Sequence, residues 1–168
     1  YIDDVTGGQA ETVLKARDHI AADAPLLIFN IDTAFRSNTL AAKLADPTND
    51  GVLGAFHSTE PRFSFAAVGA DGIVTRVTEK DPISEHALTG LYHYRRGADF
   101  LAVADAAVAR NERVKGEFYV APLYNKLIEK GAKLVVDASD AHFILGTPAE
   151  LASFLALAPD KIAALRSR

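Results

Sequence analysis

The sequence contains neither cysteine nor methionine among its 168 residues. Without cysteine the chain can form no disulfide framework and no zinc–cysteine site, and it has no thiol nucleophile. This absence agrees with a cytoplasmic protein, because disulfides are rare in that compartment. Without methionine the chain does not begin at a translation start, so we expect either a processed protein or a fragment.

An excess of basic charge and long apolar runs are also missing. The chain has 18 basic and 22 acidic residues, for a formal net charge of −4. Proteins that bind nucleic acid or anionic membranes usually carry a basic surface, so we expect neither partner. No apolar run approaches the roughly 20 residues of a membrane span. The first residues lack the cationic start and apolar stretch of a signal peptide.

What remains is the composition of a globular domain with a sizeable core. Hydrophobic residues make up 49% of the chain and charged residues 24%. A chain of this length buries about two-thirds of its unfolded surface, so it needs no disulfide or metal to fold. Length and composition therefore predict a single domain over residues 1–168.

Helix-like and strand-like segments alternate along the chain, which predicts an α/β fold with a mixed sheet. The continuous apolar run Leu26–Phe29 predicts a strand buried on both faces, as in parallel sheets. Thr6 and Thr147 are expected N-caps, Glu150 the capping-box acid, and Gly131 a C′ glycine. We expect helices over 9–21, 38–45, 98–109, 118–129, 148–157 and 161–166, strands over 26–29, 51–56, 63–68, 73–77, 88–94 and 133–136, and a hairpin turn at 69–72.

Asp32 is the first candidate functional residue, because it lies just past the strand Leu26–Phe29. Ligands of open α/β sheets bind beyond the carboxyl ends of strands, and a carboxylate there can hold Mg²⁺ near a phosphate. The alternative is a structural one, in which Asp32 caps the next helix or turn. The local pattern leaves both interpretations open.

The sequence Glu79-Lys80-Asp81-Pro82 follows another predicted strand. The Lys80 ammonium is a compact charge that could bind a phosphate, and Glu79 could accept hydrogen bonds from sugar hydroxyls. The alternative is a solvated cluster of turn charges, which composition alone favours.

Two glycine positions are further candidates. Gly90, after Thr89, lies inside a predicted strand, where glycine indicates either a close backbone approach or a β-bulge. Gly8 and Gln9 begin a predicted helix and offer backbone N–H groups and a side-chain amide for a base edge. This pattern is weak alone, since it is neither a Walker loop nor GxGxxG.

Other catalytic patterns are missing. None of the five histidines has metal-ligand spacing, so we expect them at the surface or satisfied in the core. They are His19, His57, His86, His93 and His142. No serine has the context of a nucleophile elbow, which argues against a serine hydrolase.

Taken together, the sequence resembles the sugar-1-phosphate nucleotidylyltransferases, also called NDP-sugar pyrophosphorylases. Its most specific part is a Glu-Lys-x-Pro block at residue 79, followed by Thr-Gly-x-Tyr at residue 89 and Gly-Thr-Pro at residue 146. The resemblance implies a Rossmann-like nucleotidyltransferase (GT-A-like) fold, a mixed α/β sheet flanked by helices. The matching stretches are 8–14, 25–32, 63–65, 71–74, 79–84, 87–92, 116–119 and 145–151.

The resemblance also implies an activity and roles for residues. The family makes an NDP-sugar and pyrophosphate from an NTP and a sugar 1-phosphate, with Mg²⁺ as cofactor. Asp32 would hold the metal and Lys80 would contact the sugar phosphate. The remaining positions would bind substrate: Glu79, Thr89, Gly90 and Ser64 at the sugar, and Gly8 and Gln9 near the base.

Three departures from the family pattern affect these expectations. The glycine-rich triphosphate loop, with the first strand and helix, would precede Tyr1, so we expect an incomplete domain with little or no NTP turnover by this chain alone. We also expect an exposed strand edge and a homo-oligomer. Ile144 stands where a second metal-binding Asp is common; Asp137 or Asp140 could replace it, or one acid could suffice. Ser64 stands where many members have glycine.

Two other functional classes compete with the enzyme. A noncatalytic sensor or subunit of the same fold would bind a nucleotide or sugar phosphate without turnover, as Ile144 suggests. A glycosyltransferase of a related fold would need an Asp-x-Asp metal motif, which Asp32-Thr33-Ala34 does not supply.

Overall fold

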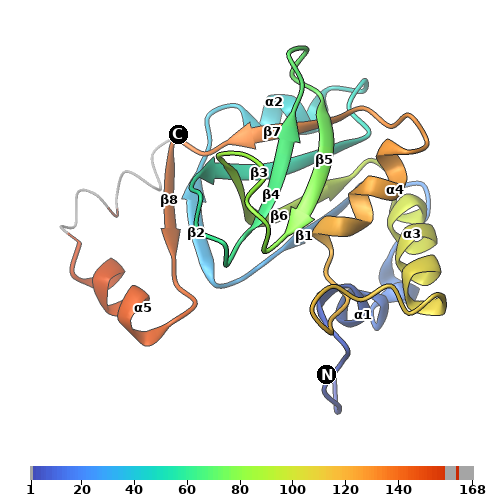
Figure 1. Ribbon diagram of the computed structural model, residues 1–168, viewed down its shortest axis with the longest axis horizontal. Coiled ribbons are helices and arrows are strands. Elements are labelled where there is room, and N and C mark those ends of the chain that lie inside the picture. The colour runs from blue at the N-terminus through green and yellow to red at the C-terminus, as the bar shows by residue number, and fades with distance from the viewer. Residues whose placement is uncertain (1, 158–161, 163–168) are drawn as a thin grey trace.

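A mixed sheet forms the centre of the computed structural model, which describes residues 2–157 and 162 (Figure 1). Its strands lie in the order β5-β4-β6-β3-β7, and β1 also pairs with β6. Among these pairs β3 and β7 are parallel, and the others are antiparallel. The strands are β1 (Leu26–Phe29), β3 (Gly51–His57), β4 (Ser64–Val68), β5 (Val74–Glu79), β6 (His86–Tyr94) and β7 (Leu134–Ala138).

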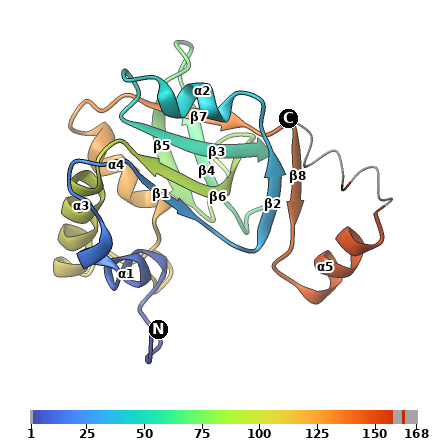
Figure 2. The same ribbon diagram turned by 180° about the vertical axis from the view of Figure 1, so that it is seen from behind.

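Short helices gather at one side of this sheet and enclose the core (Figures 1 and 2). They are α1 (Gln9–Leu14), the 3-10 helix η1 (Arg17–His19), α3 (Gly97–Ala109), the 3-10 helix η2 (Ala121–Leu123) and α4 (Tyr124–Ile128). The buried residues of α3 include Phe100, Val103, Ala104 and Ala107, the i, i+3, i+4, i+7 spacing of an amphipathic helix.

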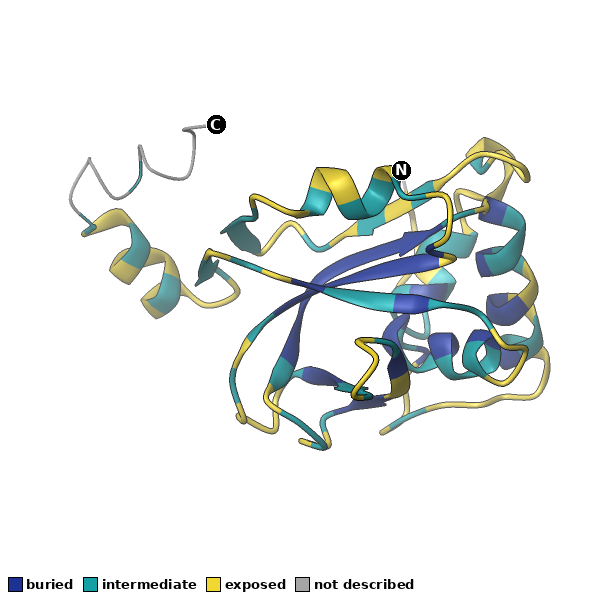
Figure 3. Cartoon of the chain, turned by 90° about the horizontal axis from the view of Figure 1, so that it is seen from above, coloured by how far each residue is buried: buried dark blue, intermediate teal, exposed yellow. Residues whose placement is uncertain are grey.

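Aromatic rings join the sheet to these helices. Tyr94 on β6 stacks on Tyr124 of α4 with ring centroids 4.5 Å apart, and it meets Phe100 edge-on at 5.3 Å. The Tyr124 hydroxyl donates a hydrogen bond of 2.9 Å to the His93 carbonyl. Figure 3 shows the central strands and the inner helix faces as buried.

A second, smaller unit lies on the other side of the sheet. Strands β2 (Thr33–Arg36) and β8 (Ala141–Ile144) form an antiparallel pair, and α5 (Pro148–Leu155) follows them. Figures 1 and 2 show this unit away from α1, α3 and α4. Helix α2 (Leu40–Ala45) packs against β3. No helix in the described part of the chain has the length and hydrophobicity needed to span a bilayer.

The sequence predicted most elements and the mixed sheet, and several local signals are confirmed. Strands β4 and β5 form the expected hairpin, with Gly72 at a φ of 81°. Gly131 has a φ of 83° after α4. The Thr147 side chain caps α5 by accepting a hydrogen bond from the Glu150 backbone N–H. The expected helix over 161–166 lies outside the described residues, except for Ile162.

Four predicted helices are shorter than expected, and those over 9–21 and 118–129 differ most. The first ends at Leu14, since the carbonyls of Ala22 and Ala24 bind the start of α3 and the chain turns towards β1. Thr6 is not its N-cap; that residue is Gly8. The helix predicted over 118–129 begins only at residue 121, because Phe118 is hydrogen-bonded to the segment before α1.

Strand β1 differs most from expectation. It is antiparallel to β6 rather than part of a parallel set, and no described strand pairs with its other edge. Its burial alternates, so that Leu27 and Phe29 are 50% and 42% exposed. The run of four apolar residues therefore forms a strand with one exposed face, and not the strand buried on both faces that was predicted. Strands β2 and β8 were not expected; both are four residues long and half-buried without alternation.

Candidate functional site

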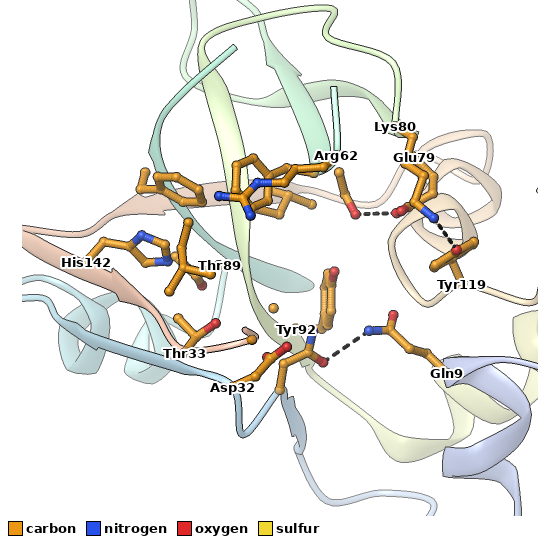
Figure 4. Close-up of a pocket in the computed structure, with 18 of the residues that line it drawn as sticks. Gln9, Asp32, Thr33, Arg62, Glu79, Lys80, Thr89, Tyr92, Tyr119 and His142 are labelled. Carbon is orange, nitrogen blue, oxygen red and sulfur yellow. Dashed lines mark hydrogen bonds between the residues drawn. The ribbon is translucent and has the colours of Figure 1, made fainter. Parts of the chain in front are cut away.

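Seven of the eight predicted site residues line one pocket of about 340 Å³ (Figure 4). The pocket lies where β4, β5 and β6 meet the start of α1, the segment after β1 and the turn before α5. A volume of this size suits a small-molecule ligand. The predicted residues in its lining are Gln9, Asp32, Ser64, Glu79, Lys80, Thr89 and Gly90.

Ser64 and Glu79 form the buried floor of this pocket. They stand opposite each other on β4 and β5, and the Ser64 hydroxyl donates a hydrogen bond to the Glu79 carboxylate. Each residue is 8% exposed. Burial raises the pKa of Glu79, because the low-dielectric surroundings disfavour its charged form. Glu79 is therefore no solvated turn residue, and it offers a hydrogen-bonding group at the end of a cavity.

Lys80 follows directly and directs its ammonium to Tyr119. The Lys80 Nζ donates a hydrogen bond of 2.7 Å to the Tyr119 hydroxyl and lies 4.9 Å from the centre of its ring. This hydrogen bond raises the pKa of Lys80. Tyr119 also lines the pocket. The sequence held no signal for its role except its place in the matching stretch 116–119.

Gly90 lies in a β-bulge, as one of the two interpretations predicted. The pairing of β6 with β3 shifts register between Leu53 and Ala55, and Gly90 has a φ of 86°. A Cβ atom at Gly90 would lie 2.7 Å from the Asn30 side chain. Only glycine combines this conformation with such an approach, and the bulge leaves the Gly90 backbone at the pocket surface.

Gln9 lines the pocket, whereas the neighbouring Gly8 does not. The Gln9 amide lines the pocket and donates a hydrogen bond of 3.2 Å to the Asn30 side chain, so two amide groups lie together there. Gly8 does not line the pocket. Its φ is 136°, and a Cβ atom would lie 2.6 Å from the Phe118 backbone nitrogen. Gly8 therefore packs against Phe118 outside the pocket lining, and its expected place near the base stays a prediction.

Asp32 lies beside the turn that precedes α5. Its carbonyl accepts a hydrogen bond of 2.8 Å from the Leu145 N–H. A Cβ atom at Gly146 would lie 3.3 Å from Asp32 Oδ2. Asp32 does not cap α2, whose N-cap is Thr39. The exposed carboxylate therefore faces the pocket rather than a helix end.

Neither proposed replacement for a second metal-binding Asp reaches this pocket. Asp137 pairs with Lys43 at 3.1 Å and accepts a hydrogen bond from Thr39. Asp140 accepts a hydrogen bond from the Asn38 backbone. Both carboxylates have structural partners outside the pocket lining. Ile144, which does line it, pairs with Thr33 next to Asp32.

An ion pair in the pocket lining joins two segments far apart in sequence. Arg62 Nη1 lies 2.6 Å from the Glu150 carboxylate at the start of α5, and Arg62 Nε lies 2.9 Å from Glu60. The hydrogen bond from Arg62 lowers the pKa of Glu150. Arg62 was not predicted as a site residue, and Glu150 was predicted only as a helix-capping acid.

An aromatic wall completes the pocket. His142 stacks on Phe56 with ring centroids 3.7 Å apart, and Phe63 meets Phe56 edge-on at 5.1 Å. Burial lowers the pKa of His142 to about 4, so the imidazole is neutral at pH 7. His142 thus lies in the pocket wall rather than at the surface, and its neutral ring adds an apolar face for a ligand.

Comparison with known proteins gives matches among solved structures only. A scan against family models and a search of curated proteins give no match. The nucleoside-diphosphate-sugar pyrophosphorylase from Vibrio cholerae RC9 is 36% identical with a TM-score of 0.77, over 93% of this chain and 68% of that one. A Bacillus anthracis protein assigned as a glucose-1-phosphate thymidylyltransferase, in complex with a sucrose, is 20% identical with a TM-score of 0.75, over 95% of this chain and 64% of that one. The chain thus spans about two-thirds of each neighbour.

Proposed function

The chain belongs to the nucleoside-diphosphate-sugar pyrophosphorylase family and has a nucleotidyltransferase fold. We propose that the whole protein makes an NDP-sugar and pyrophosphate from an NTP and a sugar 1-phosphate. The observation that carries this proposal is the meeting of seven residues, selected from separate motifs, in one pocket. Because cells hold their NTPs in the cytoplasm, we place the protein there.

The sugar phosphate binds, in this proposal, between the floor and Lys80. The Lys80 ammonium neutralises the phosphate, which is the use of a compact cation. Glu79 accepts hydrogen bonds from sugar hydroxyls, and the Gly90 backbone approaches the ring. Ser64 and Thr89 complete this end, and both are buried side chains with fixed neighbours.

The nucleotide binds at the end of the pocket that contains the paired amides. Gln9 and Asn30 each carry one acceptor and two donors, so together they can pair with the edge of a base. Their mutual hydrogen bond would then exchange for bonds to the base. This contact supports nucleotide binding without selecting one of the four bases.

The pocket fits Mg²⁺ only if the substrate supplies most of its ligands. In the described part of the chain no group of three or more His, Cys, Asp or Glu side chains can hold a metal ion. Asp32 provides one exposed carboxylate oxygen donor, which suits Mg²⁺ held by one carboxylate, phosphates and water. When bound, the ion would neutralise charge on the transferring phosphates.

The chemistry that these groups support is an in-line displacement. An oxygen of the sugar phosphate attacks the α-phosphorus of the NTP, and the bond from that phosphorus to the bridging oxygen of pyrophosphate breaks. The electron pair of the broken bond leaves with pyrophosphate. Catalysis of this kind rests on positioning and charge neutralisation, which Lys80 and the buried floor would provide.

A pyrophosphate-release assay with the four NTPs and a panel of sugar 1-phosphates tests the proposal on the whole protein. Turnover with one pairing supports it, and no turnover with any pairing contradicts it. The 168-residue chain alone should give little or none. Among the described pocket residues Lys80 is the one cation not bound to a carboxylate, too little charge for a triphosphate.

A noncatalytic sensor of the same fold is the second candidate, and Ile144 favours it. This apolar side chain lies in the pocket beside Asp32, where a second acid would strengthen metal binding. Thermal-shift titration separates the two functions. Stabilisation by an NTP that requires Mg²⁺ supports the enzyme, whereas stabilisation by a sugar phosphate without metal supports the sensor.

The exposed edge of β1 supports a further proposal, that the chain forms a homo-oligomer. Leu27 and Phe29 of β1 are 50% and 42% exposed, and Ile31, two residues after the strand, is 94% exposed. Unpaired apolar edges favour pairing with another chain. Light scattering should give a mass above 18.0 kDa that falls to the monomer in Leu27→Lys. A monomeric wild-type chain would contradict the proposal.

A further inference from the structure

A short segment between α3 and η2 connects the two ends of the pocket. We call residues 113–119 the strap. At its tip Val114 and Glu117 exchange two backbone hydrogen bonds of 2.9 and 3.0 Å. Lys115 and Gly116 have φ values of 47° and 91°, so both central residues adopt the left-handed conformation of a tight type I′ turn. Backbone hydrogen bonds within the strap therefore fix the conformation of its tip.

One side of the strap is bound to the segment that begins α1. The Phe118 N–H donates a hydrogen bond of 2.8 Å to the Gly7 carbonyl, and the Phe118 carbonyl accepts one of 2.9 Å from Ala10. Gly8 lies between these bonds. Since a Cβ atom there would lie 2.6 Å from the Phe118 nitrogen, any other residue would force the two backbones apart.

Arg113 reinforces this junction. Its guanidinium carbon lies 4.0 Å from the centre of the Phe118 ring. Its Nη1 atom donates to the carbonyls of Gly116 at 2.9 Å and Gly7 at 3.3 Å. Phe118 itself is 3% exposed and belongs to the core. The strap and the start of α1 thus form one packed unit, directly before Gln9.

The other side of the strap holds Lys80. Tyr119, next to Phe118, accepts the 2.7 Å hydrogen bond from the Lys80 ammonium, and Figure 4 shows this bond at the side of the pocket where Gln9 also lies. The Lys80 backbone has a φ of 55°, and its N–H is held by the Phe63 carbonyl at 2.9 Å. With the backbone fixed, Tyr119 sets where the ammonium points.

We propose that Tyr119 is a positioning residue for Lys80 and that the strap couples the two ends of the pocket. A nucleoside bound at Gln9 would hold this packed unit in one position and, through Tyr119, restrict the motion of the Lys80 ammonium. A phosphate that binds next then has less ordering to complete, which makes its binding tighter. By linkage the phosphate tightens nucleoside binding by the same factor. The phosphate half of this coupling rests on the proposed function of Lys80.

The positioning is tested first without any ligand, by NMR of the Lys80 side-chain ammonium in the ¹⁵N-lysine-labelled chain. Tyr119→Phe removes the acceptor and should shift the Lys80 signal and speed its proton exchange. Gly8→Ala, which makes no contact with Lys80, should shift it in the same direction. The matched control is Gly72→Ala, another glycine with positive φ, which has nothing within 4 Å of its Cβ position.

An unchanged Lys80 signal in a folded Gly8→Ala protein, or an equal shift in Gly72→Ala, overturns the coupling. If Gly8→Ala does not fold, Arg113→Gln replaces it, because it removes the guanidinium from Phe118 without a backbone clash. An unchanged Lys80 signal in Tyr119→Phe overturns the positioning role itself.

The affinity coupling is tested second, with inorganic phosphate as the probe and each of the four nucleosides in turn. We expect one nucleoside to tighten phosphate binding about fivefold in the wild type and to have no effect in Tyr119→Phe. Phosphate affinity that no nucleoside changes overturns the coupling. If the wild type binds no phosphate, the proposed role of Lys80 fails, whereas the NMR comparison still decides whether the strap positions it.

Discussion

Two of the walls of the pocket differ in construction. The sheet wall, formed by Ser64, Glu79 and Thr89, consists of buried side chains on β4, β5 and β6. The turn wall, formed by Asp32 and the residues 144–150, is half-buried or exposed and belongs to the unit of β2, β8 and α5. The sheet wall shares the core of the molecule, and the turn wall does not.

The difference in burial between the two walls suggests that they have different functions. Buried side chains in a central sheet keep one geometry, which suits the recognition of a sugar. The ion pair from Arg62 to Glu150 joins the turn wall to the segment before β4, and both side chains are partly exposed. We infer that the end that binds the sugar phosphate is preformed, and that the metal and triphosphate end is completed when substrate binds.

Lys80→Ala should have the largest effect, because it removes the charge that stands beside the sheet wall. In the whole protein we expect kcat/KM to fall by about 10²–10³-fold, as when other groups that stabilise transition-state charge are removed. Steady-state kinetics measures this. The control is Lys130→Ala, an exposed lysine after α4. Equal kinetics for wild type and Lys80→Ala would remove Lys80 from the mechanism.

The aromatic wall should give a pH-dependent stability. The pKa of His142 is about 4 in the folded chain and about 6.5 in the unfolded chain. Between pH 6.5 and pH 4 the imidazole is therefore protonated in the unfolded chain and neutral in the folded chain. Stability from this group is complete above pH 6.5 and falls as pH drops towards 4. At pH 5 the loss is at most about 2 kcal/mol, and less to the extent that solvent screens the half-buried imidazole.

His142→Phe keeps the stacked ring and removes the titration. Relative to this variant, the wild-type Tm should fall between pH 7 and pH 5, whereas the control His19→Phe, at an exposed position, should follow the wild type. Identical pH profiles for wild type and His142→Phe would show that the imidazole is not buried in its neutral form.

The ion pair of the turn wall should contribute least to stability. A double-mutant cycle of Arg62→Ala and Glu150→Ala should give a small favourable coupling in urea unfolding, because solvent screens partly exposed ion pairs. Because the pKa of Glu150 is lowered, this coupling is present above the unfolded pKa and disappears as pH falls through the folded value. A coupling of several kcal/mol would mean that the turn wall is as firmly built as the sheet wall.

Local motifs predicted the parts of the site that local sequence determines. Asp32 lies just past β1, Glu79 ends β5 and Lys80 follows it, and all three line the pocket. Thr147 and Gly131 carried out the capping roles typical of their residue types. The glycine at position 90 had two possible explanations, a β-bulge or a close backbone approach. In the structure Gly90 lies in a bulge and also lines the pocket.

The contacts that the sequence missed join residues far apart. Arg62 and Glu150 are separated by 88 positions, and Lys80 and Tyr119 by 39. No periodicity relates such pairs, because tertiary packing alone brings them together. Strand β1 could not be predicted correctly for a similar reason. A run of four apolar residues is compatible with a strand buried on both faces and with one that has an exposed face, so the sequence does not distinguish them.

Isothermal titration of a panel of sugar 1-phosphates into the 168-residue chain tests the central claim most directly. If the pocket is a preformed sugar phosphate site, one member of the panel should bind more tightly than inorganic phosphate. Lys80→Ala should weaken that binding at least about tenfold, a loss of 1.4 kcal/mol. Equal binding of every sugar phosphate and plain phosphate, or equal affinity in Lys80→Ala, would contradict the account.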